Sequence, residues 1–164
     1  MFVLISIDGL CNTSTNPIQT YTTLSANDYV KESFSYQASS TGTVILEFGF
    51  KAQNVNKYWS LDDVSLIDRN ASNLEMLING DFELGSLQSW HVVCSSTRCR
   101  GTGGMIDQSD CHTGSYCYKD ACQGAYDFLR QSFNVTDGHV YNLTFWIKSA
   151  GSPQQAAYVD IYAT

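Results

Sequence analysis

Residues 59–83 read WSLDDVSLIDRNASNLEMLINGDFE, and they contain two short segments of alternating apolar and polar residues on either side of a polar turn. Alternation of this kind is typical of a β-strand with one buried face, so strands are predicted near 58–67 and 75–82. The same pattern recurs along the chain. It predicts further strands near residues 2–8, 31–37, 43–51, 115–119, 126–134, 140–149 and 157–163.

The connections between these strands are rich in Gly, Ser and Asn, as in TDGHVYNL, where Asp137 and Gly138 predict a tight turn. No stretch combines the length and the 3.6-residue period of a helix. Abundant Thr, Tyr, Phe, Val and Ile also favour strands. Many short antiparallel strands predict an all-β chain that folds as a two-sheet sandwich.

Three pieces of the sequence resemble parts of the family 4, 9 and 22 (CenC-like) carbohydrate-binding modules. LDDVSL at 61–66 is similar to their closing strand, INGDFELGSLQSW at 78–90 to their opening strand and the turn after it, and YNLTFWIKSAGS at 141–152 to their central strand. The resemblance implies a galactose-binding-like jelly roll, which is a β-sandwich. It also implies a lectin-like module that binds an oligo- or polysaccharide without catalysis.

The order of these pieces departs from the family, because a complete module runs from NGDFE through LTFW to DDVSL, and here DDVSL comes first. The resemblance therefore implies that residues 1–68 are the C-terminal part of one module and residues 69–164 the N-terminal part of the next, from a tandem-repeat parent. Segments 2–8 and 158–164 look like one strand from successive repeats. Together the parts predict one permuted jelly roll, closed within the chain or between chains of a swapped homodimer.

The formal net charge is −7, and the 9 Lys and Arg residues are scattered singly. Phosphate recognition needs clustered positive charge, so nucleic acid is not an expected partner. No run approaches the roughly 20 apolar residues that span a bilayer, so membrane insertion is not expected either. The three histidines lie outside any nucleophile or metal-hydrolase motif, so the chain is not predicted to be an enzyme.

The even number of cysteines, five of the six within 29 residues, predicts disulfides in an oxidising compartment rather than a zinc site. About 15 pairings are open; local spacing favours Cys94 with Cys99 and Cys117 with Cys122, which leaves Cys11 with Cys111. Glycosylation sequons begin at Asn12, Asn70, Asn134 and Asn142. The predicted location is extracellular. MFVLISID does not resemble a signal peptide, so a signal is expected upstream of this fragment, unless the chain is a truncated gene product.

Acidic residues gather where the opening and closing strands would lie side by side. Glu83, Asp81 and Asp62 offer the hard oxygen ligands that calcium takes. The resemblance adds that such modules hold a structural calcium through the Glu of the opening motif and the Asp of the closing motif, here Glu83 and Asp62. The alternative is that Asp62 and Asp63 are solvated charges at a strand edge and that Asp81 caps a turn. A structural Ca2+ is the predicted cofactor.

A sugar presents an apolar C–H face and a rim of hydroxyl groups, so it binds an exposed aromatic ring beside carboxylate and amide groups. Alternation in YNLTFWIK directs Trp146 and Lys148 outward, and alternation in YVDIY does the same for Tyr158, Asp160 and Tyr162. If these two strands pair, the side chains form one shallow platform for a glycan. The alternative is that they form cross-strand pairs or pack under a loop or a partner.

A second candidate site lies in SYCYKDACQGAYDF, where Tyr116, Tyr118, Asp120 and Tyr126 surround a disulfide-braced turn. The alternative function is a structural or adhesive extracellular repeat whose outward aromatic residues contact neighbouring modules. A third interpretation is a severed gene product without an independent function. Saturable sugar binding distinguishes the first function from the second.

Overall fold

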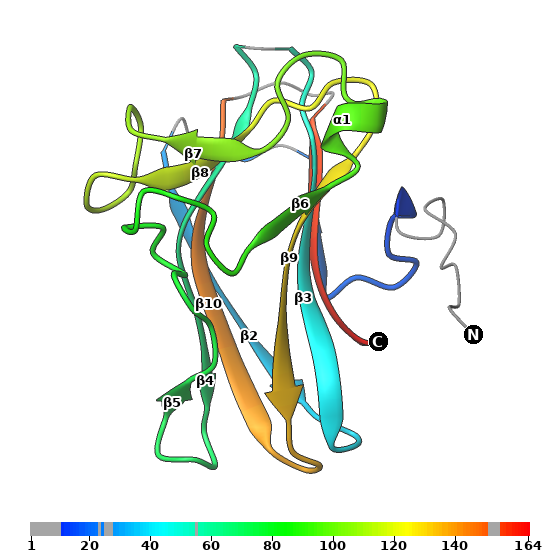
Figure 1. The fold of residues 1–164 in the computed structure, drawn as a ribbon, viewed down its shortest axis with the longest axis vertical. Coiled ribbons are helices and arrows are strands. Elements are labelled where there is room, and N and C mark those ends of the chain that lie inside the picture. The colour runs from blue at the N-terminus through cyan, green and yellow to red at the C-terminus, as the bar shows by residue number, and fades with distance from the viewer. Residues whose placement is uncertain (1–10, 23, 25–27, 55, 151–154) are drawn as a thin grey trace.

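The computed structural model describes residues 11–22, 24, 28–54, 56–150 and 155–164, and Figure 1 shows its ribbon. Its regular structure is β-strand apart from one short helix, α1 (Ser95–Arg98). The predicted strand at 2–8 lies outside the described residues. The strands are β1 (Gln19–Tyr21), β2 (Val30–Gln37), β3 (Gly42–Lys51), β4 (Trp59–Asp68), β5 (Leu74–Glu75), β6 (His91–Val93), β7 (Met105–Asp107), β8 (Cys117–Asp120), β9 (Asp127–Val135), β10 (Val140–Ser149) and β11 (Ala156–Ala163).

The strands form two antiparallel sheets that face each other (Figure 1). The five-stranded sheet has the order β1-β11-β3-β9-β6, and the six-stranded sheet has the order β2-β10-β4-β8-β7 with β5 paired to β4. The prediction of an all-β two-sheet sandwich is therefore confirmed.

Both parts of the chain contribute to both sheets. In the five-stranded sheet β3 lies between β11 and β9, and in the six-stranded sheet β4 lies between β10 and β8. Strands β1–β4, which end at Asp68, and strands β5–β11, which begin at Leu74, thus share one sandwich. Their origin in a tandem-repeat parent and the swapped homodimer stay predictions.

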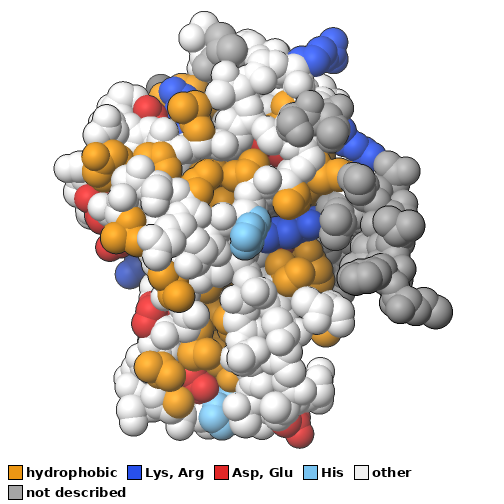
Figure 2. Space-filling model, in the orientation of Figure 1, with side chains coloured by type: hydrophobic (Ala, Val, Ile, Leu, Met, Phe, Trp, Pro, Cys, Tyr) orange, Lys and Arg blue, Asp and Glu red, His pale blue; other side chains and the backbone are white. Residues whose placement is uncertain are grey.

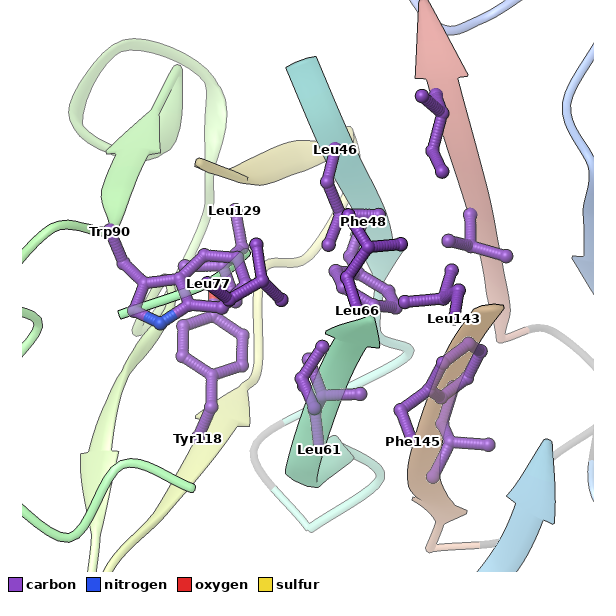
Figure 3. Packing of buried hydrophobic residues seen from close by; sticks show 14 of the residues in the cluster. Leu46, Phe48, Leu61, Leu66, Leu77, Trp90, Tyr118, Leu129, Leu143 and Phe145 are labelled. Atoms are coloured by element: carbon purple, nitrogen blue, oxygen red, sulfur yellow. The ribbon is translucent and has the colours of Figure 1, made fainter. Parts of the chain in front are cut away.

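The core lies between the sheets and follows the alternation of each strand. In β10 the inward residues Tyr141, Leu143, Phe145 and Ile147 are buried, as their positions in YNLTFWIK predict. Phe145 meets Phe48 of the other sheet edge to face, with ring centroids 5.0 Å apart. Figure 3 shows Phe48, Leu143 and Phe145 among the side chains between the two layers. Rings packed in this way stabilise the sandwich beyond the burial of their area.

The strand predicted at 75–82 is mostly wrong. Of this segment only Glu75 is in a strand, at the end of the short β5 that pairs with β4, and the chain then turns, with positive φ at Asn79 and Phe82. Strand backbone has negative φ, so these two residues end the extended segment. The turn buries the Phe82 ring against Trp90, and the Trp90 indole N–H donates to the Asn79 carbonyl at 2.9 Å. The burial of these two rings therefore outweighs the alternating pattern of residues 75–82 in determining the local backbone conformation.

All six cysteines form disulfides, but the favoured pairings are wrong. The bonds are Cys11–Cys94, Cys99–Cys122 and Cys111–Cys117. Helix α1 separates Cys94 from Cys99, while Cys117 opens the extended strand β8 and Cys122 lies beyond its end. The pairings favoured by local spacing are wrong because a disulfide forms between cysteines whose strands or loops lie side by side in the fold. The sequence does not specify which segments these are.

Candidate functional site

A row of polar side chains crosses the outer face of the five-stranded sheet. The strand register places Asp160 opposite Glu47, Glu47 opposite Arg130, and Arg130 opposite His91, on β11, β3, β9 and β6 in turn. Directly opposed residues in an antiparallel sheet point to the same side. That side faces away from the core, because Phe48, which follows Glu47 on β3 and points the other way, packs between the sheets.

Glu47 is the centre of this row and is only 1% exposed. Arg130 Nε donates to its Oε2 atom at 2.5 Å, the Tyr162 hydroxyl donates to the same oxygen at 2.7 Å, and the Tyr158 hydroxyl donates to Oε1 at 2.5 Å. A buried carboxylate is costly unless it is paired and hydrogen-bonded. These donors satisfy Glu47 and fix the positions of both tyrosine hydroxyls.

Residues 11–18 run beside this row and turn it into a hollow. Cys11 is tied to Cys94, and Ser14 Oγ donates to Asp160 Oδ2 at 2.5 Å. The hollow has a volume of about 460 Å³. It is lined by residues 12–16, Glu47, Arg130, Asp160, Ile161 and Tyr162. A space of this size, with polar groups at fixed places, is within the range of small-ligand sites.

Tyr162, which lines the hollow, and the buried Tyr158 beside it are hydrogen-bond donors at neutral pH. Burial, and next the hydrogen bond to Glu47, raise the pKa of Tyr158 and of Tyr162 far above the usual tyrosine range. Burial also raises the pKa of Asp160, although its hydrogen bond from Ser14 opposes the shift. Tyr162 is partly exposed, so the hollow combines an aromatic surface with polar groups.

An apolar cluster adjoins the polar row. It contains the buried residues Cys11, Phe128 and Tyr158, with Val93 and Tyr126 packed against them. Tyr126, predicted to line a loop tip, stacks on Phe128 with ring centroids 6.4 Å apart and lies 5.8 Å from the Tyr158 ring. The cluster therefore anchors, through Cys11, one end of the segment 12–16 that forms the wall of the hollow.

Gly49 on β3 provides a test of how tightly the Tyr158 ring is packed against the outer face of the sheet. A Cβ atom at Gly49 would lie 2.3 Å from the Tyr158 ring, whereas a Cβ atom at Gly42 on the same strand meets nothing within 4 Å. We expect Gly49→Ala to displace the ring and lower the unfolding free energy by about 1–3 kcal/mol. Gly42→Ala is the matched control and should not destabilise the protein. Urea unfolding of both variants measures the difference, and equal stability would contradict this packing.

The single predicted platform is not formed, because the two strands that were to build it do not pair. β10 pairs with β2 and β4, whereas β11 pairs with β1 and β3. Trp146 and Lys148 therefore lie on the outer face of the six-stranded sheet. Tyr158, Asp160 and Tyr162 lie on the opposite outer face of the sandwich.

Trp146 packs under a loop of its own chain. The His112 ring stacks on it with centroids 3.8 Å apart, and Lys148 Nζ lies 2.7 Å from an Asp110 carboxylate oxygen. The Cys111–Cys117 disulfide closes this loop. The alternative of outward aromatic residues that pack beneath a loop therefore describes Trp146, and less of its ring is available to a ligand.

The second candidate site is also not assembled at the surface. Tyr118 is fully buried between Phe50 and Phe82, and its hydroxyl donates to Asp120, which is buried too. Figure 3 shows Tyr118 among the core side chains near Trp90. Short local alternation placed this tyrosine wrongly, because packing between the sheets decides its side.

The predicted calcium ligands bind backbone groups instead of converging. Asp62 Oδ2 accepts the N–H groups of residues 112–113, and Glu83 Oε1 accepts those of residues 115–116, so both pin one loop. Within the described residues, Asp62, Glu83 and Asp81 do not form a ligand group, and the groups that do lie within 4.8 Å all contain disulfide-bonded cysteines. Asp62 Oδ2 and Glu83 Oε1, which would be ligands of a cation, already accept these N–H groups. The arrangement does not fit a shared ion, so calcium stays a prediction from the resemblance alone.

Comparisons with protein-family models, curated proteins and solved structures gave no match. Among the described residues, no helix is long and apolar enough to cross a membrane. On the face shown in Figure 2, basic side chains are scattered and form no continuous patch.

Sequence reasoning missed Glu47, Arg130 and Ser14. A signal for Glu47 was present, since it is the one charged residue in VILEFGF and falls at an outward position. A lone carboxylate within an apolar strand predicts a buried partner. Arg130 and Ser14 carry no comparable signal, because their roles depend on which segments lie beside β3 and β11.

Proposed function

We propose that the protein is a non-catalytic, extracellular carbohydrate-binding module and that it holds a neutral saccharide in the hollow on the five-stranded sheet. The observation that supports this most is the buried Glu47, held by Arg130 and two tyrosine hydroxyls beneath a partly exposed Tyr162 ring. Fixed polar groups beside an aromatic surface suit a ligand with hydroxyl groups and an apolar face.

The charges of the hollow favour a neutral sugar over an anionic one. Among its described lining residues Glu47 and Asp160 are acidic, whereas Arg130 is basic and already paired with Glu47. An incoming carboxylate or sulfate would meet excess negative charge in a partly desolvated site. A formal chain charge of −7 acts in the same direction.

The hydrogen bonds support binding rather than turnover. Each Glu47 oxygen receives a donor, and Asp160 accepts hydrogen bonds from Ser14 and from the Ile161 N–H. A general base or nucleophile needs an oxygen that can reach the substrate. Three disulfides support an oxidising compartment, so secretion is part of this proposal.

Calorimetry against a panel of soluble neutral glycans tests this function. We expect saturable binding that weakens about tenfold in Tyr162→Ala, because an aromatic contact contributes about 0.5–1.5 kcal/mol beyond the apolar area that it buries, and the variant loses both contributions. Tyr162→Phe keeps the ring and should retain more affinity than Tyr162→Ala. Trp146→Ala is the matched control on the opposite sheet.

Loss of binding in Trp146→Ala but not in Tyr162→Ala would move the site to the six-stranded sheet. No binding by folded protein, together with self-association in sedimentation, would favour the adhesive repeat. The adhesive alternative has some support in Leu74, Ile78 and Leu84, which are 57–59% exposed within one short segment.

A further inference from the structure

Asn12 stands at the rim of the proposed sugar site. Its side chain is exposed, and the residue lines the hollow together with Asp160 and Tyr162. The sequence Asn12-Thr13-Ser14 is an acceptor for N-linked glycosylation. The same short segment therefore carries a modification signal and forms the wall of the hollow.

The backbone on both sides of Asn12 is held in place. The preceding residue, Cys11, is bonded to Cys94, and Ser14 donates its hydroxyl to Asp160 and its N–H to the Tyr158 hydroxyl oxygen at 3.1 Å. A glycan attached to Asn12 would start from a fixed position at the rim. It would not be carried away by free movement of the chain.

We infer that Asn12 carries an N-linked glycan whose first sugars cover the hollow and compete with an external saccharide. This inference rests on the proposed function for its consequence, but the glycan itself is detectable without any external ligand. The glycan would act as a tethered occupant of the site.

The modification is a transfer from a polyprenyl diphosphate-linked oligosaccharide, supplied by the transferase of a secretory host. The Asn12 Nδ2 atom forms a bond to C1 of the first sugar, the bond between C1 and the diphosphate oxygen breaks, and the polyprenyl diphosphate leaves. The amide nitrogen loses one proton to a base, so atoms and charges balance. The product keeps an N–H and gains a bulky neutral group beside the hollow.

A tethered sugar competes well because its effective concentration is high. Short flexible tethers give effective concentrations on the order of 1 mM or more. External glycan must displace it, so the glycosylated protein should bind an external sugar about tenfold more weakly than the unmodified protein if the first sugars fit the hollow.

The other sequons provide a matched control away from the hollow. Asn70 lies in the exposed turn after β4, on the six-stranded sheet, and its Oδ1 atom accepts the Val140 N–H at 2.8 Å. Ser72→Ala removes this sequon and leaves that contact in place. At the rim, Asn12→Gln is the better change, because the hydroxyl of its own sequon belongs to Ser14 and binds Asp160.

The experiment expresses wild type, Asn12→Gln and Ser72→Ala in a secretory eukaryotic host. Intact mass before and after enzymatic deglycosylation reports occupancy, calorimetry with the glycan panel reports affinity, and hydrogen exchange reports protection of residues 12–16. We expect Asn12→Gln to lack one glycan, to bind about tenfold more tightly than wild type, and to lose protection at residues 12–16. Ser72→Ala should match wild type in affinity and protection.

An unoccupied Asn12, or an occupied Asn12 with equal affinity in wild type and Asn12→Gln, would overturn the inference. If no variant binds any glycan, the proposed function fails, and hydrogen exchange still decides the inference. Protection that depends on Asn12 supports a seated glycan, whereas equal exchange in wild type and Asn12→Gln rejects it.

Discussion

The double variant Cys11→Ser/Cys94→Ser is expected to lose about 4.5 kcal/mol of unfolding free energy in the chain-entropy description of disulfides. This bond spans 83 residues of sequence, the widest of the three, so its removal frees the unfolded chain most. It also frees the segment that forms the wall of the hollow, so sugar binding should weaken together with stability. Urea unfolding and calorimetry measure the two effects.

The control for this change is Cys111→Ser/Cys117→Ser. That bond spans only 6 residues, so the same description gives a loss of about 2 kcal/mol. It closes the loop over Trp146 on the opposite sheet and should leave the hollow intact. A larger loss of stability from the short bond than from the long one would contradict this ranking, and retained binding in Cys11→Ser/Cys94→Ser would separate the wall from the site.

A second large effect concerns Asp120 and Asp127, two fully buried carboxyl groups in hydrogen-bond contact. Asp127 Oδ2 accepts the Gly104 N–H at 3.0 Å, whereas its buried Oδ1 atom receives no hydrogen bond from a fixed donor of the described chain. We expect Asp120 to keep a proton that it shares with that oxygen. Burial, and next the hydrogen bond and charge of Asp127, raise the pKa of Asp120 well above its usual 3.8.

The sign of the pH dependence follows from that proton, which the folded protein keeps and the unfolded chain releases. The contribution to stability is complete below the ordinary pKa of 3.8 and is lost as pH rises through the raised pKa. Between these two limits the unfolding free energy falls by up to about 1.4 kcal/mol per pH unit. Burial also raises the pKa of Asp62 to about 6. The stability that Asp62 contributes in its protonated form is therefore lost by about that pH.

Asp127→Asn should therefore flatten the stability profile above about pH 6, where the loss from Asp62 has ended, and make the variant more stable than wild type once the pH exceeds the raised pKa of Asp120. The new amide donates to Asp120 in place of the shared proton, while its oxygen still accepts the Gly104 N–H. Urea unfolding at a series of pH values measures the slope. Asp137→Asn, the same change in an exposed turn, controls for net charge. Parallel profiles for wild type and Asp127→Asn would show that the pair holds no such proton.

The long strands were predictable and the site was only partly so. The strand predicted at 140–149 coincides with β10, because ten alternating residues give a clear period, whereas β1, β6 and β7 have only three residues each. The outward directions of Tyr158, Asp160 and Tyr162 followed from the same alternation. The alternation of one strand does not identify its neighbours. For this reason Trp146 was placed with the wrong group, and Glu47 was not recognised as its centre.

The interleaving of early and late strands has a consequence for synthesis of the protein on the ribosome. β3 contains the apolar run VILEFGF, yet both of its neighbours, β9 and β11, come from the last 38 residues of the chain, Asp127–Thr164. At about 5–20 residues per second, the nascent chain exposes this unpaired strand for several seconds. An apolar strand without neighbours can pair with another chain. Slower initiation, lower temperature or a chaperone that holds nascent chains should therefore raise the yield of folded protein, even though none of them alters the finished sandwich.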